Sequence, residues 1–193
     1  MPVDVVIEGG TVVTPTGILE TGIAVDEGKI VAVGLPANLP KAERVIRAEG
    51  RLVVPGVVDG HPHIFDPDYS YREDFSTGSQ ASAAGGVTTF IDMPLREAVV
   101  PPYLAEKIRI GEAESLVDFS LHSGMITQDK VGKIQEAAGY GVLSFKAYTC
   151  EPFFVDDATL MEIMDAVAEV NGVLNVHAEN NRTVSRLTEK AKS

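Results

Sequence analysis

The sequence predicts an α/β fold, in which a small β module precedes part of a TIM-type (β/α)8 barrel. From residue 52 onward, short apolar runs alternate with stretches of helical spacing, which is typical of βα units and a parallel sheet. Polar side chains recur at the ends of these runs, roughly once per βα unit. In a barrel of about 250 residues, one such unit has about 31 residues. The polar side chains belong to His61, His63, Asp92, His122, Lys146 and His177.

The first 52 residues form the predicted β module. Apolar runs rich in β-branched residues, separated by glycine and proline turns, predict strands at residues 3–8, 11–14, 23–25, 29–34 and 44–50. The turn Asp26-Glu27-Gly28 between two of these runs is a hairpin signal. We therefore expect a small antiparallel module (residues 1–52) without a catalytic constellation, followed directly by the barrel part (residues 53–193).

Five strands and their helices make up the predicted barrel part. The starts of four helices are marked by Asp74, Pro101, Asp129 and Asp156, residue types that favour the first turn of a helix. A further helix is expected from residue 182 to 193. About five of the eight units of such a barrel are thus present. The strands are expected at residues 52–59, 87–92, 117–121, 142–146 and 173–176.

Composition argues against several classes of function. The chain of 193 residues has a net charge of −12 and no basic cluster, so a nucleic-acid partner is not expected. No apolar run approaches the ~18 residues of a membrane span, and the start lacks a secretory signal. The single cysteine, Cys150, excludes an intrachain disulfide and favours the cytoplasm. We interpret Cys150 as a buried residue at a strand end rather than as a nucleophile.

The first polar cluster follows the apolar run Val53-Val-Pro-Gly-Val-Val. Asp59, His61 and His63 alternate along the chain, and residues two apart on a strand point to the same face. Two imidazoles so placed can hold one divalent metal ion such as zinc. The alternative is a pair of ordinary surface histidines. Asp59 shares the face and would orient the histidines.

Lys146 lies inside the apolar strand Val142-Leu-Ser-Phe-Lys-Ala-Tyr148. Lysine is rarely buried unless it is paired, because the desolvation of an ammonium group is costly. A lysine that extends to the strand end is one interpretation. The other is a neutral, nucleophilic amine, which can add carbon dioxide to give a carbamate. A carbamate has two oxygens and can bridge two metal ions.

Three more polar residues end predicted strands. His177 could be a hydrogen-bonded core histidine, but its convergence with His61, His63 and Lys146 favours a metal ligand. For His122 we favour packing or support of a ligand. Asp92 could support a ligand histidine, bind substrate or bond to the backbone.

Five motifs together resemble the cyclic amidohydrolases, the family that includes dihydropyrimidinase or hydantoinase, allantoinase and dihydroorotase. The motifs lie in the family's order and at compatible spacing, and the resemblance extends from about residue 3 to the end. No single motif is specific, but the combination is. The motifs are Pro55-Gly-Val-Val-Asp-Gly-His-Pro-His63, Ala83-Ala-Gly-Gly-Val-Thr-Thr89, Asp92-Met-Pro94, Ser144-Phe-Lys-Ala147 and Val176-His-Ala-Glu-Asn180.

The resemblance implies a metal-dependent hydrolase barrel with a flanking β-sandwich that residues near both termini form. It implies two divalent metal ions, with zinc as the expected metal. His61 and His63 would bind one ion, His177 would bind the other, and N-carboxylated Lys146 would bridge them. The family's sixth-strand histidine and its catalytic aspartate on strand eight would both lie beyond Ser193. We therefore expect a fragment, a truncated protein or one chain of a complementing pair.

Other departures from the family bear on the substrate. Dihydroorotases usually carry an arginine and an asparagine that hold the substrate carboxylate, where this chain has Phe65 and Leu95. Hydantoinases usually have a substrate tyrosine where this chain has Glu151, unless Tyr148 substitutes. The residues around Asp92 and Lys146 look most like allantoinases, and those around His177 look more like hydantoinases.

The sequence thus predicts an enzyme that hydrolyses a cyclic amide such as allantoin, a hydantoin or a dihydropyrimidine. Metal-activated water would attack the ring carbonyl. Because the expected proton donor is absent, we predict that the isolated chain is weakly active or inactive. The open edges of a partial barrel also predict a homo-oligomer or a second chain. The alternatives are a non-catalytic dihydropyrimidinase-like scaffold, a dihydroorotase, and a hydrolase with one metal held by His61, His63 and His177.

Overall fold

The computed structural model describes residues 1–94 and 100–192. The chain divides into two compact units, Met1–Gly56 and Val57–Ser193. All five α-helices of the described residues belong to the second unit. Among the helices of the described ranges, none combines the length and the apolar character that a membrane span requires.

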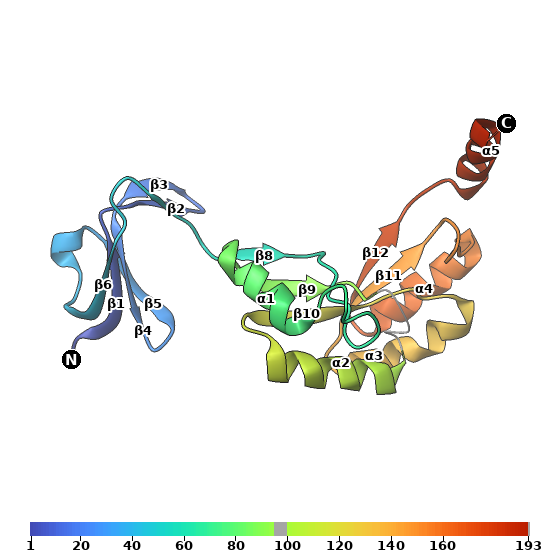
Figure 1. Cartoon of the computed structure of the whole chain (residues 1–193), viewed down its shortest axis with the longest axis horizontal. Coiled ribbons are helices and arrows are strands. Elements are labelled where there is room, and N and C mark those ends of the chain that lie inside the picture. Colours follow the sequence, from blue (N-terminus) through green and yellow to red (C-terminus); the bar gives the residue numbers. More distant parts are fainter. Residues whose placement is uncertain (95–99, 193) are drawn as a thin grey trace. The chain divides into compact units, whose positions relative to one another are not determined.

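The first unit contains two small sheets (Figure 1). One has the strand order β5-β4-β1-β6, and the other has the order β3-β2-β7. The predicted hairpin is confirmed, because β4 and β5 are antiparallel and Glu27 and Gly28 both have positive φ, as a tight hairpin turn requires. The bounds are β1 Val3–Glu8, β2 Thr11–Thr14, β3 Gly17–Glu20, β4 Gly22–Asp26, β5 Lys29–Gly34, η1 Pro36–Asn38, β6 Ala42–Arg47 and β7 Leu52–Val53.

The expectation of a purely antiparallel module is wrong. Strand β1 pairs with β4 in antiparallel fashion but with β6 in parallel, and β2 pairs with β7 in parallel. A short turn forces antiparallel pairing, whereas the long connections from β1 to β6 and from β2 to β7 allow parallel pairing. The expected β-sandwich with residues near both termini stays a prediction.

The predicted strand at residues 52–59 is interrupted. Leu52 and Val53 form β7 and pair with β2, whereas Val57–Asp59 forms β8 and pairs with β9. Pro55 and Gly56 lie between the two pieces. Proline has no N–H to donate to a sheet and glycine weakens a strand, so the pairing stops here and the strand divides between the two units.

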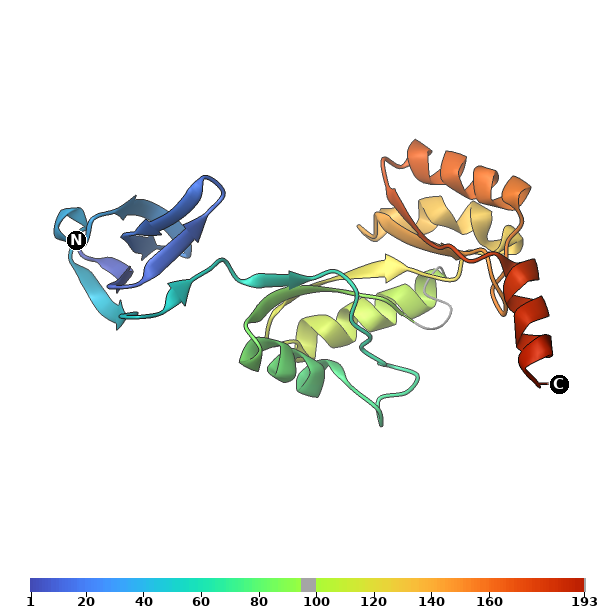
Figure 2. The same ribbon diagram turned by 90° about the horizontal axis from the view of Figure 1, so that it is seen from above.

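The second unit is built on a curled sheet of five parallel strands with the order β12-β11-β10-β9-β8 (Figures 1 and 2). Each strand pairs with the next along the chain, which is the order of one side of a barrel. The strands are β8 Val57–Asp59, β9 Val87–Asp92, β10 Asp118–Ser123, β11 Ser144–Tyr148 and β12 Val173–His177. The helices are α1 Phe75–Ala84, α2 Pro101–Glu114, η2 Gln128–Lys133, α3 Ile134–Gly139, α4 Asp157–Glu169 and α5 Asn181–Lys192.

One apolar core joins the sheet to helices α1 to α4. Neighbouring helices contact one another in chain order. Helices and strands both contribute large, fully buried side chains, as expected when helices cover one face of a parallel sheet. They include Phe75 in α1, Phe90 in β9, Leu104 in α2, Phe145 in β11 and Ile163 in α4.

Most predicted helix starts are confirmed. Asp74 and Asp156 cap α1 and α4, and each carboxylate accepts a hydrogen bond from a backbone N–H three residues later. Helix α2 begins at Pro101. Asp129 does not open an α-helix, because its carboxylate accepts a 2.6 Å hydrogen bond from the Thr127 hydroxyl and the segment forms the 3-10 helix η2.

Strand β11 begins two residues later than predicted, at Ser144 instead of residue 142. Gly141 has a positive φ after helix α3, and the Val142 N–H donates to the Ala137 carbonyl. The Gly141 N–H donates to Ala138, so the helix ends in a Schellman motif. Val142 is therefore part of the helix C-terminus, although its apolar character resembles that of the strand.

Gly111 lets helix α2 approach strand β10. A Cβ atom at this position would lie 2.4 Å from Cζ of Phe119, whose ring packs against Phe75 and Phe90. We expect Gly111→Ala to destabilise the second unit by about 1–3 kcal/mol through overpacking. Urea unfolding, followed by the helical circular-dichroism signal, measures this change.

Gly139 provides the matched control, because a Cβ atom there would meet nothing within 4 Å and its φ is not positive. Gly139→Ala should leave the free energy of unfolding unchanged or raise it slightly, since alanine favours helix. Equal effects of the two substitutions would contradict the proposed contact between Gly111 and Phe119.

Candidate functional site

The polar residues singled out from the sequence lie at the C-terminal ends of the five parallel strands. Asp92 ends β9, His122 lies near the end of β10, Lys146 is the middle residue of β11 and His177 ends β12. His61 follows β8. In parallel barrels, the loops at this edge of the sheet converge on one site. The strand order therefore provides the geometry for a shared site.

His61 and His63 do not lie on a strand, contrary to the expectation of one pleated face. Strand β8 ends at Asp59, and the two histidines follow in a loop. The Asp59 carboxylate accepts a 3.0 Å hydrogen bond from the His61 N–H and thereby shapes this loop. The imidazole centroids of His61 and His63 are 5.5 Å apart, so the loop keeps the two rings adjacent.

The orientation of His63 is set by the backbone. Its Nδ1 lies 2.6 Å from the carbonyl oxygen of Met93. A carbonyl only accepts, so Nδ1 carries the proton and Nε2 is the lone-pair nitrogen. A histidine with this kind of hydrogen bond is typical of metal sites, where a carbonyl fixes the tautomer of the ligand.

Asp92 and Lys107 form a buried ion pair beneath this loop. Both side chains are almost fully buried, and Lys107 Nζ lies 3.0 Å from Asp92 Oδ2. Asp92 Oδ1 accepts a 2.5 Å hydrogen bond from the Ile64 N–H. Burial raises the pKa of the Asp92 carboxyl, and the Lys107 ammonium opposes this rise. Asp92 thus bonds the backbone next to His63, which agrees with a supporting role.

Lys107 extends the same network along the loop. Its ammonium donates to the carbonyl oxygens of Ile64 at 2.6 Å and Asp66 at 2.5 Å. Lys107 is not among the residues predicted from the sequence. A signal was present, because Lys107 lies three residues after Leu104 and four before Gly111, on the buried face of α2. A lysine on the apolar face of a helix requires a buried partner.

Lys146 is buried, with 6% of its surface exposed. Among the described residues no carboxylate forms an ion pair with its ammonium, and Nζ lies 5.6 Å from the Tyr148 ring centroid. Desolvation lowers the pKa of Lys146. Burial also lowers the pKa of His61, and the charges of Lys146, His63 and His122 lower it further. This influence indicates that Lys146 lies near His61.

His122 is bonded at both ring nitrogens and links three elements. Nε2 lies 2.9 Å from the Gly60 carbonyl and must donate to it, so Nδ1 accepts from the Ser144 hydroxyl at 2.5 Å. Asn175 Nδ2 donates in turn to Ser144 Oγ at 3.0 Å. The chain of hydrogen bonds ties the His61 loop to β11 and β12, which agrees with the supporting role favoured for His122.

Ser144 and Asn175 were missed in the sequence analysis. Each lies two residues before a predicted site residue, Ser144 before Lys146 and Asn175 before His177, and therefore on the same strand face. A search for polar residues at this spacing would have found both.

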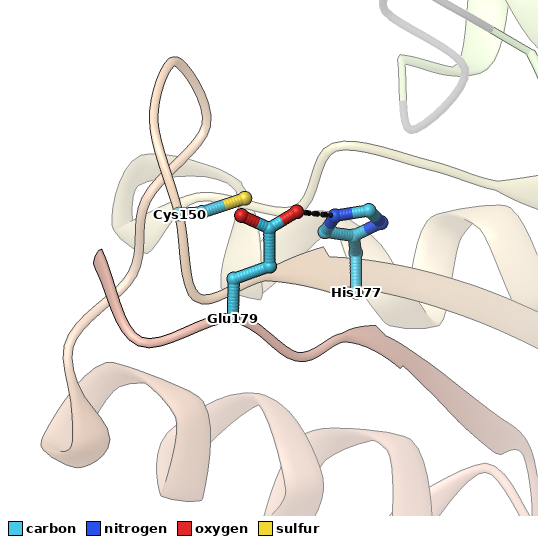
Figure 3. Close-up of side chains that lie close together, drawn as sticks. All are labelled: Cys150, His177 and Glu179. Carbon is cyan, nitrogen blue, oxygen red and sulfur yellow. Dashed lines mark hydrogen bonds and ion pairs between the residues drawn. The ribbon is translucent and has the colours of Figure 1, made fainter. Parts of the chain in front are cut away.

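His177 takes part in a different cluster. Its ring stacks on Tyr148 at 5.4 Å between centroids. Its Nε2 lies 2.5 Å from Glu179 Oε1, and Figure 3 shows this pair. Cys150 Sγ lies close to both, since the three donor atoms are all within 4.8 Å of one another. Within residues 1–94 and 100–192, no such group of three combines His177 with His61 and His63.

Tyr148 and Cys150 belong to the surroundings of His177. Tyr148 is half-buried, and burial together with the nearby Cys150 raises its pKa. Cys150 is buried, and burial followed by the charges of Glu179 and Glu151 raises the pKa of its thiol. A raised thiol pKa disfavours the nucleophilic thiolate, which agrees with the interpretation of Cys150 as a buried residue.

The positions that bear on the substrate are partly visible. Phe65 stacks against His63 with ring centroids 6.3 Å apart, and the Arg72 guanidinium lies 5.3 Å from the Phe65 ring centroid. An apolar ring thus lies beside the candidate site at the position where dihydroorotases carry an arginine. Leu95 lies outside the described residues.

The donor set of the site suits divalent metals. His61 and His63 offer adjacent imidazole nitrogens, and the hydrogen bond of His63 fixes its lone-pair nitrogen. Lys146 offers a buried amine without a carboxylate partner among the described residues, which is the setting in which a neutral amine is favoured. The residues therefore fit zinc or a similar ion.

Comparisons with known proteins show which proteins the chain is similar to. The sequence profile of the amidohydrolase family matches residues 52–193. The chain is 36% identical to an allantoinase from Bacillus licheniformis over 99% of this chain and 45% of the relative. It is 40% identical to an allantoinase from Enterococcus faecalis over 97% of this chain and 44% of the relative.

A solved structure is similar along the whole chain. The L-hydantoinase (dihydropyrimidinase) from Arthrobacter aurescens aligns with a TM-score of 0.89 and 32% identity, and covers 98% of this chain and 44% of the hydantoinase. The chain therefore spans less than half the length of the proteins it matches.

Proposed function

Because this chain belongs to the amidohydrolase family, we propose that it supplies the metal ligands of a hydrolase that opens a cyclic amide. The substrate class is a cyclic ureide such as allantoin, a hydantoin or a dihydropyrimidine. The similarity to allantoinases and to an L-hydantoinase supports this class. The observation that carries the proposal is that the adjacent His61 and His63 rings follow β8 while the buried Lys146, on β11 of the same curled parallel sheet, lies close enough to lower the pKa of His61.

The proposed site holds two divalent ions, with zinc as the expected metal. His61 and His63 would bind the first ion, and His177 would bind the second. Lys146 would supply a ligand to both ions after its amine adds carbon dioxide and loses a proton to solvent to give a carbamate. The depressed pKa of Lys146 supports this role, because only the neutral amine reacts with carbon dioxide. His177 has to turn away from Glu179 to join the set.

Bound ions would supply an activated water at neutral pH and would polarise the scissile carbonyl. The residues of this chain hold the candidate ligands in place. The Met93 carbonyl holds the proton on Nδ1 of His63, so that Nε2 would be the nitrogen that binds an ion. The bonds from His122 to Gly60 and Ser144 keep the loop of His61 against β11. Phe65 adds an apolar wall, which favours a ureide ring over the carboxylate substrate of a dihydroorotase.

The outer strands of the five-stranded sheet support the proposal of further polypeptide. Among the described strands, β8 and β12 each pair on one side only. Both carry exposed valines, with Val58 and Val173 each 62% exposed. Unpaired strand edges with apolar side chains favour pairing with more polypeptide. We propose that further polypeptide covers them and supplies the proton donor for the leaving nitrogen.

Metal content and ring opening test the proposed function. We expect the chain, loaded with zinc in bicarbonate buffer, to retain about two ions, and a His61→Ala/His63→Ala variant to retain at most one. Hydrolysis of allantoin, hydantoin and dihydrouracil should be far below the ~1–10³ s⁻¹ of ordinary enzymes. Zinc retention that is unchanged in the double variant would refute the site, and ordinary turnover by the isolated chain would refute the need for a further proton donor.

A further inference from the structure

The single cysteine of the chain lies beside His177 at the end of the sheet (Figure 3). Cys150 follows strand β11, and His177 and Glu179 lie at the end of strand β12, which pairs with β11. The three side chains point toward one another, and their donor atoms all lie within 4.8 Å. Two adjacent strands thus bring a sulfur, a nitrogen and an oxygen ligand to one point.

These ligand types suit a particular class of metal. Thiolate sulfur with imidazole selects zinc, cadmium and other thiophilic ions, whereas magnesium, calcium and manganese prefer sets of oxygen ligands. A site with three protein ligands leaves one position for water, as tetrahedral coordination requires. His177 Nε2 and Glu179 Oε1 now share a hydrogen bond of 2.5 Å, and an ion would replace the shared proton.

The cluster is accessible to an ion from solvent. The side chains of His177 and Glu179 are 45% and 40% exposed. Cys150 and Glu179 also line a surface pocket of about 340 Å³ between the end of β11 and helix α5. Glu151 and Glu189 line the same pocket, and Lys192 is its only cation among the described lining residues. The surplus of carboxylates favours a cation there.

We propose that Cys150, His177 and Glu179 form a second metal site that takes a thiophilic divalent cation. On binding, the Cys150 thiol gives its proton to solvent and its sulfur bonds the ion. The site uses His177, so an ion held there removes this ligand from the set of His61, His63 and Lys146. This last consequence rests on the proposed function, and it makes the second site inhibitory toward cyclic-amide hydrolysis.

Cadmium titration of the full chain tests the site directly. Because Cys150 is the only cysteine, any sulfur-to-cadmium charge-transfer absorption in the ultraviolet reports on this residue alone. We expect the absorption to saturate at one cadmium ion per chain. Cys150→Ser should abolish it, and Glu179→Gln and His177→Gln should each weaken cadmium binding by more than about tenfold.

Glu151→Gln is the matched control. Glu151 lines the same pocket, and its substitution by glutamine removes one negative charge, as Glu179→Gln does. The Glu151 carboxylate is not part of the three-ligand cluster. Cadmium affinity in this variant should stay within about twofold of the parent value, as expected for a carboxylate that acts only through its distant charge. Equal losses in Glu151→Gln and Glu179→Gln would show attraction to a general acidic surface and would overturn the site.

A second readout separates a three-ligand site from a lone thiolate. Cadmium should slow the alkylation of Cys150 by iodoacetamide in the parent chain but much less in Glu179→Gln and His177→Gln. Parent-like protection and affinity in both variants would mean that cysteine alone binds the ion, and the proposal would fail. Far-ultraviolet circular dichroism of each variant confirms that the comparison is made on folded protein.

The His61→Ala/His63→Ala variant makes this test independent of the proposed function. It removes two ligands of the proposed catalytic set and none of the Cys150 cluster. We expect its cadmium absorption to equal that of the parent chain. Loss of the absorption would show that the cluster is not a separate site. Zinc retention unaffected by the double substitution, with the cadmium absorption intact, would instead refute only the proposed function.

Discussion

Lys107→Met should lower the free energy of unfolding of the second unit by about 3–5 kcal/mol, the usual cost of leaving one buried charge without its partner. The Asp92 carboxylate would remain fully buried, and the carbonyls of Ile64 and Asp66 would lose their donor. Urea unfolding followed by the helical circular-dichroism signal measures this loss.

The effect should depend on pH. Burial raises the folded-state pKa of Asp92 above its unfolded value. In the variant the opposing ammonium is gone, so the folded state binds this proton more strongly than the unfolded chain does. When the folded-state pKa of a carboxyl is raised, the group costs no stability below its unfolded-state pKa, where it is protonated in both states. The free energy of unfolding then falls as the pH rises from the unfolded-state pKa to the folded-state pKa. The deficit of Lys107→Met should therefore shrink in acid and be largest at neutral pH.

Two variants serve as controls for Lys107→Met. Lys107→Met/Asp92→Asn removes the uncompensated charge and keeps an acceptor for the Ile64 N–H, so it should be more stable than the single variant. Arg109→Met breaks the exposed ion pair with Glu106 on the same helix and should have no measurable effect. A loss below about 1 kcal/mol for Lys107→Met would contradict a dry ion pair.

In a Cys150→Ser background, which removes the second proposed site, Lys146→Met should remove most of the zinc that the chain retains. Methionine fills similar space but has no amine, so neither a carbamate nor a bridging ligand can form. We expect the zinc affinity to fall by more than about tenfold in competition with a chelator. In the parent chain, retention should also fall when bicarbonate and carbon dioxide are excluded, and Lys146→Met should be insensitive to bicarbonate.

Lys133→Met is the matched control, because Lys133 is a surface lysine paired with Glu136. It should leave zinc content and bicarbonate dependence unchanged. One firmly held ion in Lys146→Met, with no bicarbonate dependence in the parent, would favour the alternative of a single metal bound by His61, His63 and His177. Two ions in Lys146→Met would exclude any role of the lysine as a ligand.

Local signals in the sequence predicted much of the second unit. Asp74, Asp156 and Pro101 start helices because each satisfies or avoids an unpaired N–H of the first turn. The recurrence of polar residues predicted the strand ends, because one βα unit has a nearly constant length. These features depend on residues close together in the chain, so the sequence alone was enough to place them.

Local signals failed where a residue could serve two elements. Val142 is apolar like the strand that follows, but its N–H donates to the Ala137 carbonyl in the C-terminal cap of α3 at Gly141. Pro55 divides one apolar run between two units. His61 and His63 have strand spacing, yet β8 ends before them and the bond from Asp59 shapes a loop. In each case a backbone hydrogen bond, present or missing, decides the outcome.

By itself, the sequence determined the family, the order of the parallel strands and the residues at their ends, because these follow from motifs and from a regular spacing. Only the tertiary structure decided which side chains meet. Lys107 reaches Ile64 and Asp92, and His122 joins Gly60 to Ser144. His177 lies with Cys150 and Glu179. Such contacts depend on helix placement and strand register, which are set by the packing of the whole core and not by any local pattern.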